Sequence, residues 1–163
     1  MDLNKAQLKF IQDWGNLSTN WGIKSAVGRI HALLLISKEP LCADMVMEEL
    51  SMSRGASNMN LKELLNWKVI KKVHKPGNRK DFYEAEKDFA KVFKFIIQER
   101  KKRELDPLLG LLEEVNKVQP TCPESNEFCK ITKELGRFAT KADRAFNVIT
   151  SSGAEWISKV MIQ

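Results

Sequence analysis

The segment Arg54–Trp67 contains polar residues whose types and spacing are suited to hydrogen bonding with a ligand. At about 100° per residue, a helix over this segment gathers its leucines on one side and presents a nearly uncharged polar face on the other. That outward face carries Arg54, Gly55, Asn58, Met59 and Lys62. Asn can bond adenine bidentately, Arg and Lys suit guanine, and a thioether can touch a thymine methyl group. We therefore expect these five residues to read base edges in a DNA groove, the alternative being an ordinary solvent-facing helix.

A cluster of cations follows this helix around a Pro-Gly turn. Its members are Lys71, Lys72, Lys75, Arg79 and Lys80. Lysines supply phosphate contacts that add affinity without sequence information, and Arg79 just past the turn suits insertion into a narrow minor groove. Ser53, at the start of the helix, would leave free backbone amides for a phosphate. The alternative is a basic hairpin that its charges keep soluble.

The elements that must position these residues read as a winged helix-turn-helix. A short helix from Ala43 or Asp44 to Leu50 is followed by the turn Ser51–Ser53, where Ser53 is a good N-cap. Two rather polar strands, Val69–His74 and Lys80–Ala85, flank the turn Lys75–Arg79. Such a module places one helix in a DNA groove with a hairpin beside it.

Helical patterns occupy the rest of the chain. We predict amphipathic helices over Leu3–Asn20 and Ser25–Ser37, with Gly28 allowing close packing in the second. A long helix starts at Asp88, and Asp106-Pro107 marks either a kink or a fresh start before the pattern resumes. The last predicted elements are a loop over Gln119–Ser125 and helices over Asn126–Ser151 and Ala154–Ile162.

The predicted fold class is mostly α with a small β-hairpin wing. We expect residues 1–87 to form a winged helix-turn-helix domain with N-terminal helices, and residues 88–163 to form a helical region for dimerisation and effector sensing. The helices after the wing carry more apolar surface than a small head domain can cover. Because symmetric dimers are the commonest oligomers, a second chain is the expected cover.

Charge and composition exclude several classes of protein. Between Arg54 and Arg103 lie 15 of the 27 Lys/Arg and 6 of the 21 Asp/Glu, a local net charge of +9 that overlaps the predicted helix and wing. The start of the chain lacks the apolar region of a secretory signal, and no apolar run is long enough to span a bilayer. We expect a cytoplasmic protein with reduced thiols, no membrane partner, no metal and no cofactor. The usual hydrolase and phosphate-loop motifs are missing, so an enzyme is not predicted.

Two further groups of residues, the tryptophans and the cysteines, each have a functional and a structural interpretation. Trp14 and Trp21 lie two helical turns apart and could line an aromatic cage for a quaternary ammonium ligand, but a helix or dimer core is the favoured explanation. Cys122 and Cys129, with Cys42 and two histidines, could form a redox or metal sensor. Their C-x6-C spacing matches no common zinc pattern, so incidental thiols are favoured.

The run SRGASNMNLKELLNWKVIKKVHKPGNRKDFYEAEKD, with QLKFIQDWGNLSTNWGI and IHALLLISKEPL before it, resembles the GbsR branch of the MarR-type transcriptional regulators. The resemblance extends over roughly Leu3–Leu112. It implies a homodimeric, repressor-type regulator whose terminal helices make the dimer. Some members respond to choline-like ligands, so a small-molecule effector is an expected partner, although no sensing motif here matches residue by residue.

The sequence as a whole predicts a sequence-specific regulator that binds double-stranded DNA as a homodimer, on a pseudo-palindromic operator. The alternative is a winged-helix protein–protein interaction module whose basic face contacts an acidic partner.

Overall fold

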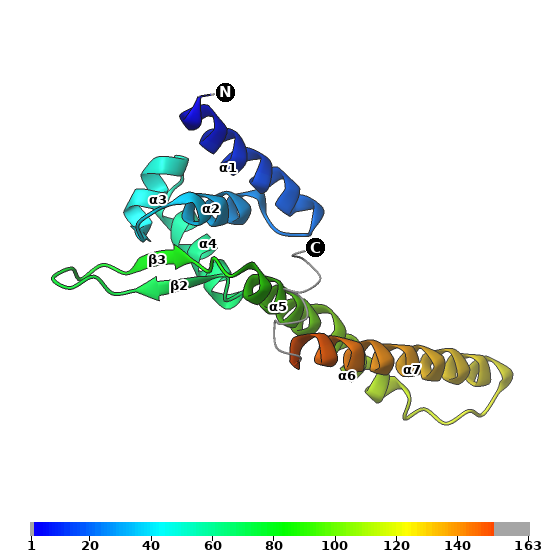
Figure 1. Ribbon diagram of the computed structural model, residues 1–163. Helices are drawn as coiled ribbons and strands as arrows, with labels where there is room; N and C mark the ends of the chain where they lie inside the picture. Colours follow the sequence, from blue (N-terminus) through cyan, green and yellow to red (C-terminus); the bar gives the residue numbers. More distant parts are fainter. Residues whose placement is uncertain (1, 152–163) are drawn as a thin grey trace, which may run out of the picture. The chain divides into compact units, whose positions relative to one another are not determined.

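The computed structural model describes residues 2–151, which form two compact units (Figure 1). The first unit, Met1–Val92, contains four helices, α1 (Leu3–Asn20), α2 (Ser25–Ile36), α3 (Ala43–Leu50) and α4 (Arg54–Asn66), with strands β1 (Leu41–Cys42), β2 (Ile70–Val73) and β3 (Phe82–Ala85). The second unit begins at Phe93 within α5 (Phe89–Arg100). It continues through η1 (Lys101–Leu105), α6 (Asp106–Val115) and α7 (Pro123–Ser151). The predicted fold class, mostly α with a small β wing, is confirmed.

Helices α1 and α2 cross at unusually short range in the head unit. A Cβ built on Gly28 would lie 2.1 Å from Ser18 Oγ, and one built on Gly15 would lie 2.5 Å from Arg29 Cγ. A side chain at either position would force its neighbours to shift, because both contacts are shorter than a Cβ atom makes in a folded protein and both glycines are buried. The prediction that Gly28 allows close packing is therefore confirmed.

The helix-turn-helix forms where the sequence predicts it. Helix α3 ends at Ser51, which has a left-handed backbone with φ of 51°, and the Met52 N–H donates to the Met47 carbonyl. Helix α4 packs on α2 and α3 through Ser57, Leu61 and Leu64, which are all buried. The Ser57 hydroxyl donates to the Ala43 carbonyl at 3.2 Å, so this buried polar group joins the two helices of the motif.

The wing belongs to a sheet of three strands rather than two. Strand β3 is central: it pairs antiparallel with β2, where Lys71 faces Glu84, and with β1, where Leu41 faces Tyr83. The two-residue strand β1 was not predicted, because its residues precede α3 without an alternating pattern. The expectation that both strands are polar is wrong for β3, since Phe82, Tyr83 and Ala85 are buried. A central strand packs side chains on both faces.

Helix α5 continues into α6 through the π-helical segment η1, so the helical chain from Phe89 to Val115 has no intervening loop. Pro107 lies in the first turn of α6 and cannot donate a backbone hydrogen bond. The wider η1 turn directly before it accommodates this loss, and the Asp106 N–H donates to the Lys101 carbonyl. Lys101 Nζ also pairs with Asp106 at 2.7 Å and with Asp143 of α7 at 2.8 Å.

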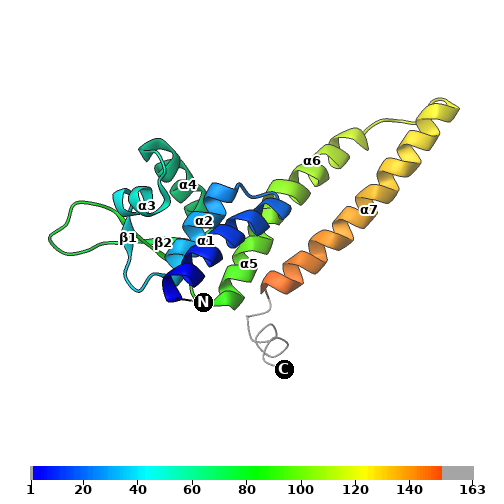
Figure 2. The same cartoon turned by 90° about the horizontal axis from the view of Figure 1, so that it is seen from above.

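Helix α7 runs beside α6 in both ribbon views (Figures 1 and 2). It begins at Pro123, so the predicted loop Gln119–Ser125 ends three residues earlier than expected, because proline suits a first helical turn. Cys129 and Ala139 are buried on the side facing α6 and η1. The predicted helix Ala154–Ile162 lies outside the described residues.

Between residues 2 and 151, no helix combines the length and the apolar content that crossing a bilayer requires. In the same residues, no group of three or more His, Cys, Asp or Glu side chains is arranged to hold a metal ion.

The buried His31 makes the stability of the head unit depend on pH. Its side chain is 8% exposed against Trp14, and burial lowers its pKa from 6.5 to about 4. As the pH falls from 6.5 towards 4, His31 therefore becomes protonated in the unfolded chain but stays neutral in the folded chain. We expect unfolding to become easier by about 3 kcal/mol over this window, with full stability above it.

Urea unfolding of the wild type and of His31→Leu between pH 4 and 7 measures this contribution. The variant should lose the corresponding part of the pH dependence, whatever its stability at pH 7. An identical pH slope in both proteins would show that His31 is not responsible.

Candidate nucleic-acid interface

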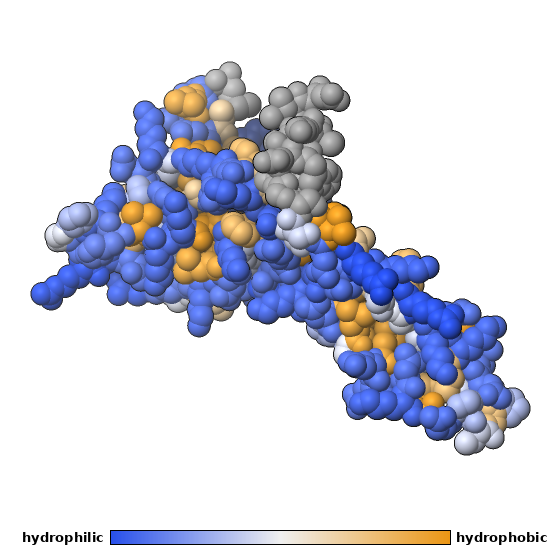
Figure 3. Space-filling model, turned by 60° about the horizontal axis from the view of Figure 1, so that its bottom comes forward, coloured by the Kyte–Doolittle hydropathy of each residue, from blue (hydrophilic) through white to orange (hydrophobic). Residues whose placement is uncertain are grey.

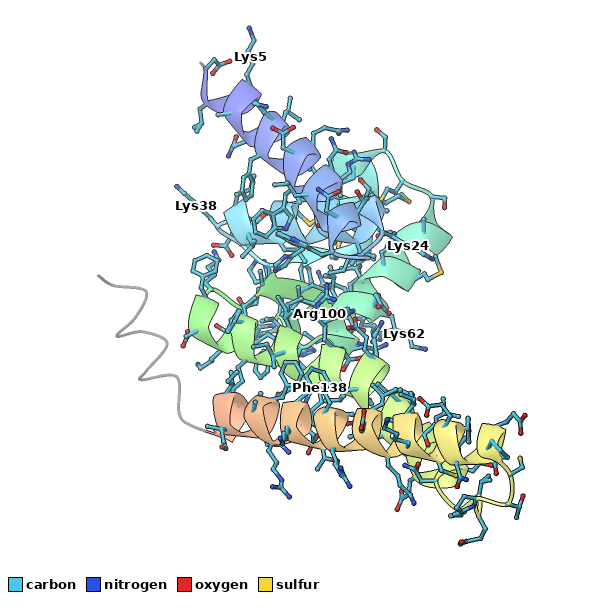
Figure 4. All side chains as sticks on the ribbon, turned by 90° about the vertical axis from the view of Figure 1, so that its right-hand side faces the viewer. Lys5, Lys24, Lys38, Lys62, Arg100 and Phe138 are labelled. Carbon is cyan, nitrogen blue, oxygen red and sulfur yellow. The ribbon has the colours of Figure 1, made fainter. Side chains whose placement is uncertain are left out.

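The outward face of α4 is exposed as the helical wheel predicts. Arg54, Gly55, Asn58, Met59 and Lys62 are all exposed, and Met59 keeps 58% of its surface despite its apolar side chain. Lys62 points away from the body of α4 (Figure 4). A Cβ added at Gly55 would meet nothing within 4 Å, so this turn of the helix offers bare backbone to a ligand. The five residues thus form one continuous face, which we call the reading face.

Ser53 caps the start of the reading face. The Ala56 N–H donates to Ser53 Oγ at 3.2 Å, and the Ser57 N–H donates to the Ser53 carbonyl at 2.9 Å. The N–H groups of Arg54 and Gly55 precede the first intrahelical bond, and both residues are exposed. This end of α4 can therefore donate hydrogen bonds to an anion at the edge of the reading face.

The basic side chains of the wing are held mainly by cross-strand ion pairs. Lys71 Nζ lies 2.9 Å from Glu84, and Lys72 Nζ lies 2.6 Å from Asp81. These hydrogen bonds raise the pKa of both lysines. Lys75 lies 4.7 Å from the centroid of the Phe82 ring and 3.7 Å from Glu39.

Arg79 differs from these lysines. It is exposed in the turn after Gly77, whose φ is 79°, and within the described residues it forms no ion pair. The Lys80 N–H donates to Asn78 Oδ1 at 3.0 Å, which fixes the turn around Arg79. This side chain is the one in the wing that can reach a polyanion without first breaking an ion pair.

Asp44 links the wing to the reading face, and sequence reasoning missed it. Lys80 Nζ donates to Asp44 Oδ2 at 2.7 Å, and Arg54 Nη2 donates to Oδ1 at 3.3 Å. The Lys80 hydrogen bond and charge, with a smaller contribution from Arg54, lower the pKa of the Asp44 carboxyl. Lys80 is 36 residues away in sequence, so no local pattern could have indicated the pair.

The two tryptophans and the cysteines occupy ordinary structural surroundings. Trp14 and Trp21 meet edge to face, with ring centroids 6.1 Å apart, so their packing on each other accounts for their spacing. The cage for a ligand at these residues stays a prediction. All three cysteines are free, with Cys42 and Cys129 buried and Cys122 exposed.

Comparison with known proteins bears directly on the head unit. No family model matches the chain. It is 32% identical over 94 residues to GbsR, an HTH-type transcriptional repressor of Bacillus subtilis, covering 58% of this chain and 52% of that protein. OpcR, another HTH-type transcriptional repressor of this bacterium, is 27% identical over 73 residues, or 45% of this chain and 40% of OpcR. The resemblance to the GbsR branch is confirmed.

The chain spans about half the length of these GbsR-type relatives or less. The fold is supported over a longer range by a crystal structure of a transcriptional regulator, which matches with a TM-score of 0.73 at 17% identity. That match covers 94% of this chain and 99% of the other. The fold of nearly the whole chain, the helical second unit included, therefore has a counterpart among solved structures.

Removing the Asp44 carboxylate should strengthen binding to duplex DNA without regard to sequence. Asp44→Asn frees Arg54 and Lys80 and removes a negative charge that would repel phosphate. We expect affinity at low salt to rise roughly fivefold and the salt slope to steepen by about one unit. Fluorescence anisotropy over a salt series measures both quantities.

Glu48→Gln is the matched control, because Glu48 is exposed on the same helix and forms no ion pair in the described part of the chain. If both substitutions changed affinity and slope equally, general charge rather than the Asp44 pairs would be responsible.

Proposed function

We propose that this chain is a cytoplasmic transcriptional regulator, of the repressor type, that binds a specific double-stranded DNA sequence as a homodimer. The observation that carries the proposal is the reading face: short polar side chains and an uncovered glycine lie exposed on a helix that is packed firmly on its other side. The repressor names of the GbsR-type relatives support this over a protein–protein module.

On this proposal the reading face enters the major groove, which is wide enough to admit an α-helix. Asn58 and Arg54 are suited to bidentate bonds with adenine and guanine, and Met59 is suited to contact with a thymine methyl group. The amides at the Ser53 end bind a backbone phosphate and so fix how far the helix enters. Gly55 permits the close approach that these contacts need.

The wing supplies affinity rather than base choice. Its paired lysines exchange carboxylate partners for phosphates, which releases counterions and makes binding steeply dependent on salt. Arg79 is the exception, because it can enter the adjacent minor groove, where narrow A·T tracts have the most negative potential. On this proposal α4 recognises bases, and the hairpin mainly contacts the DNA backbone.

A homodimer would present two reading faces to two half-sites about one helical turn apart, which implies a pseudo-palindromic operator. Any effector that changes the separation of the two heads would weaken binding, because affinity depends on both heads matching that spacing. We propose a small molecule as that effector and leave its chemistry to direct screening.

Selection of duplex DNA from a random pool by the purified full-length protein tests the proposed function. We expect one enriched, two-fold symmetric motif, a footprint over it, and affinity that falls steeply between low and moderate salt. A protein that showed no preference over competitor DNA at moderate salt would not be a sequence-specific regulator.

Two substitutions should separate base recognition from backbone binding on the selected operator. Asn58→Ala should weaken operator binding by about 1–3 kcal/mol and relax base choice at one position per half-site, with little effect on random DNA. Lys72→Ala, which removes a phosphate-contacting lysine of the wing, should weaken binding to operator and random DNA alike and reduce the salt slope by about one unit. Parallel titrations on both DNAs measure the difference.

Asn16→Ala on α1 is the matched control, because this exposed asparagine lies outside the reading face and the wing. Equal losses on operator and random DNA for Asn58→Ala would contradict a base-reading role for Asn58.

A further inference from the structure

A groove with a volume of about 650 Å³ lies between α6 and α7, within the second unit. Leu109 and Leu112 supply apolar lining on the α6 side, and Leu112 is 4% exposed. Apolar side chains show between polar ones over the α6–α7 region (Figure 3). The α7 side of the groove carries four basic residues, which are Lys133, Arg137, Lys141 and Arg144.

The four groove cations lie on one side of α7, without an acidic neighbour on that side. At about 100° per residue they fall within an arc of about 80°, which contains none of the acidic residues of α7. All four are exposed, and none forms an ion pair within residues 2–151. Successive members are three or four residues apart, a spacing at which like charges destabilise a helix. An anion bound between them would relieve a repulsion that the described part of the chain leaves in place.

Basic residues on the neighbouring helical turns are neutralised within the chain. Arg100 lies 3.0 Å from Glu104, and Lys101 Nζ lies 2.8 Å from Asp143. The groove contains a single carboxylate, Glu113 on the α6 side, and it forms no ion pair with the groove cations. Four cations and one carboxylate leave the lining with a net charge of +3.

A hydrogen-bond donor of fixed orientation lies beside the groove cations. The Thr132 hydroxyl donates to Asn116 Oδ1 at 2.7 Å, which fixes the direction of the side-chain amide. Asn116 Nδ2 lies 3.5 Å from the position that a Cβ at residue 136 would occupy. Because Gly136 has no side chain, this N–H₂ group is not covered from that side. Both residues line the groove, so the amide can donate to a ligand there.

We propose that this groove binds a small organic molecule that carries a diphosphate group. Arg and Lys form the strong, charge-assisted hydrogen bonds that phosphate oxygens accept. The groove cations extend over about 16 Å of helix, enough for contacts to more than one phosphate. A diphosphate ester carries about three negative charges near neutral pH, which matches the net charge of the lining better than one carboxylate or one phosphate does.

The apolar lining indicates that the ligand has an organic part as well. An inorganic anion would leave Leu109 and Leu112 in contact with water, whereas an organic body could cover them. The volume of the groove also lies within the range of about 300–1,000 Å³ that is usual for small-molecule sites. The inference goes beyond the proposed function, because none of the lining residues belongs to the reading face or to the wing.

Duplex DNA is the rival occupant, because cations bind phosphate whatever its source. A duplex could touch the exposed cations at the rim. It could not enter a groove between two packed helices, whose axes lie about 8–10 Å apart. Blocking the groove without changing its charge therefore distinguishes the two occupants.

Calorimetric titration of the full-length protein with ADP, without DNA or divalent cations, tests the site. We expect saturable binding, and we expect inorganic pyrophosphate to bind roughly fivefold more weakly because it cannot cover the apolar lining. Arg137→Ala should weaken ADP binding roughly tenfold. Lys130→Ala is the matched control: Lys130 is exposed on the same side of α7 but does not line the groove, so its removal should change the affinity less than about twofold.

Substitution of Gly136 tests the groove at constant charge. Gly136→Leu places a branched side chain beside Asn116 and should weaken ADP binding by more than about tenfold. Gly136→Ala is its control, because the added methyl group meets Asn116 Nδ2 at an ordinary contact distance of 3.5 Å. Both substitutions replace a glycine within α7 by a better helix former, so helix content by circular dichroism should not fall.

Three outcomes would overturn the inference. A wild type that gives no heat with ADP has no such site, and equal affinities for ADP and pyrophosphate would show that no organic part is recognised. If Arg137→Ala weakened binding to random duplex DNA as strongly as binding to ADP, while Gly136→Leu changed neither, the cations would serve DNA instead. None of these results bears on the selection of operator DNA through the reading face, so the proposed function would stand.

Discussion

The burial of one side of α4 is the constraint on which the rest of the head unit depends. Ser57, Leu61 and Leu64 pack against α2 and α3, and the Ser57 hydroxyl is hydrogen-bonded to the Ala43 carbonyl. Because one face of the helix is fixed in this way, the opposite face must point outward, and its rotation about the helix axis is determined. A reading face is useful only if that rotation does not vary, since base edges present their donors and acceptors in fixed directions.

In the free protein, ion pairs hold most of the basic side chains of the wing in place, but these pairs can be exchanged. Carboxylates on β3, in the wing, on α3 and in the loop before β1 hold four of its five cations in ion pairs, and Asp44 alone holds one from the wing and one from α4. Pairs this exposed add little stability and are readily exchanged. On the proposed function their value is positional, because they would keep the cations near the geometry that DNA binding needs and would temper attraction to random DNA. Arg79, which lacks such a pair in the described residues, is the natural first contact.

The second unit is organised by the packing of α7 along α6 and η1. Helix α7 packs against α6 with small residues such as Ala139, which permit close approach, while Phe128 and Phe138 are exposed. Lys101 joins the adjoining π-helical turn to α7 through its ion pair with Asp143.

The sequence by itself determined the elements and the outward residues of α4. Helical periodicity, the Ser53 cap and the Pro-Gly turn are local signals, so the bounds of α1 and the start of α4 came out as predicted, and the reading face followed from the wheel. The first two residues of the sheet, the Asp44 pairs and the buried character of β3 depend on residues far apart in sequence. Only tertiary structure could decide them, because pairing partners and burial are set by which segments meet. The same holds for α7, where packing against α6 and η1 decides which side of the helix is buried.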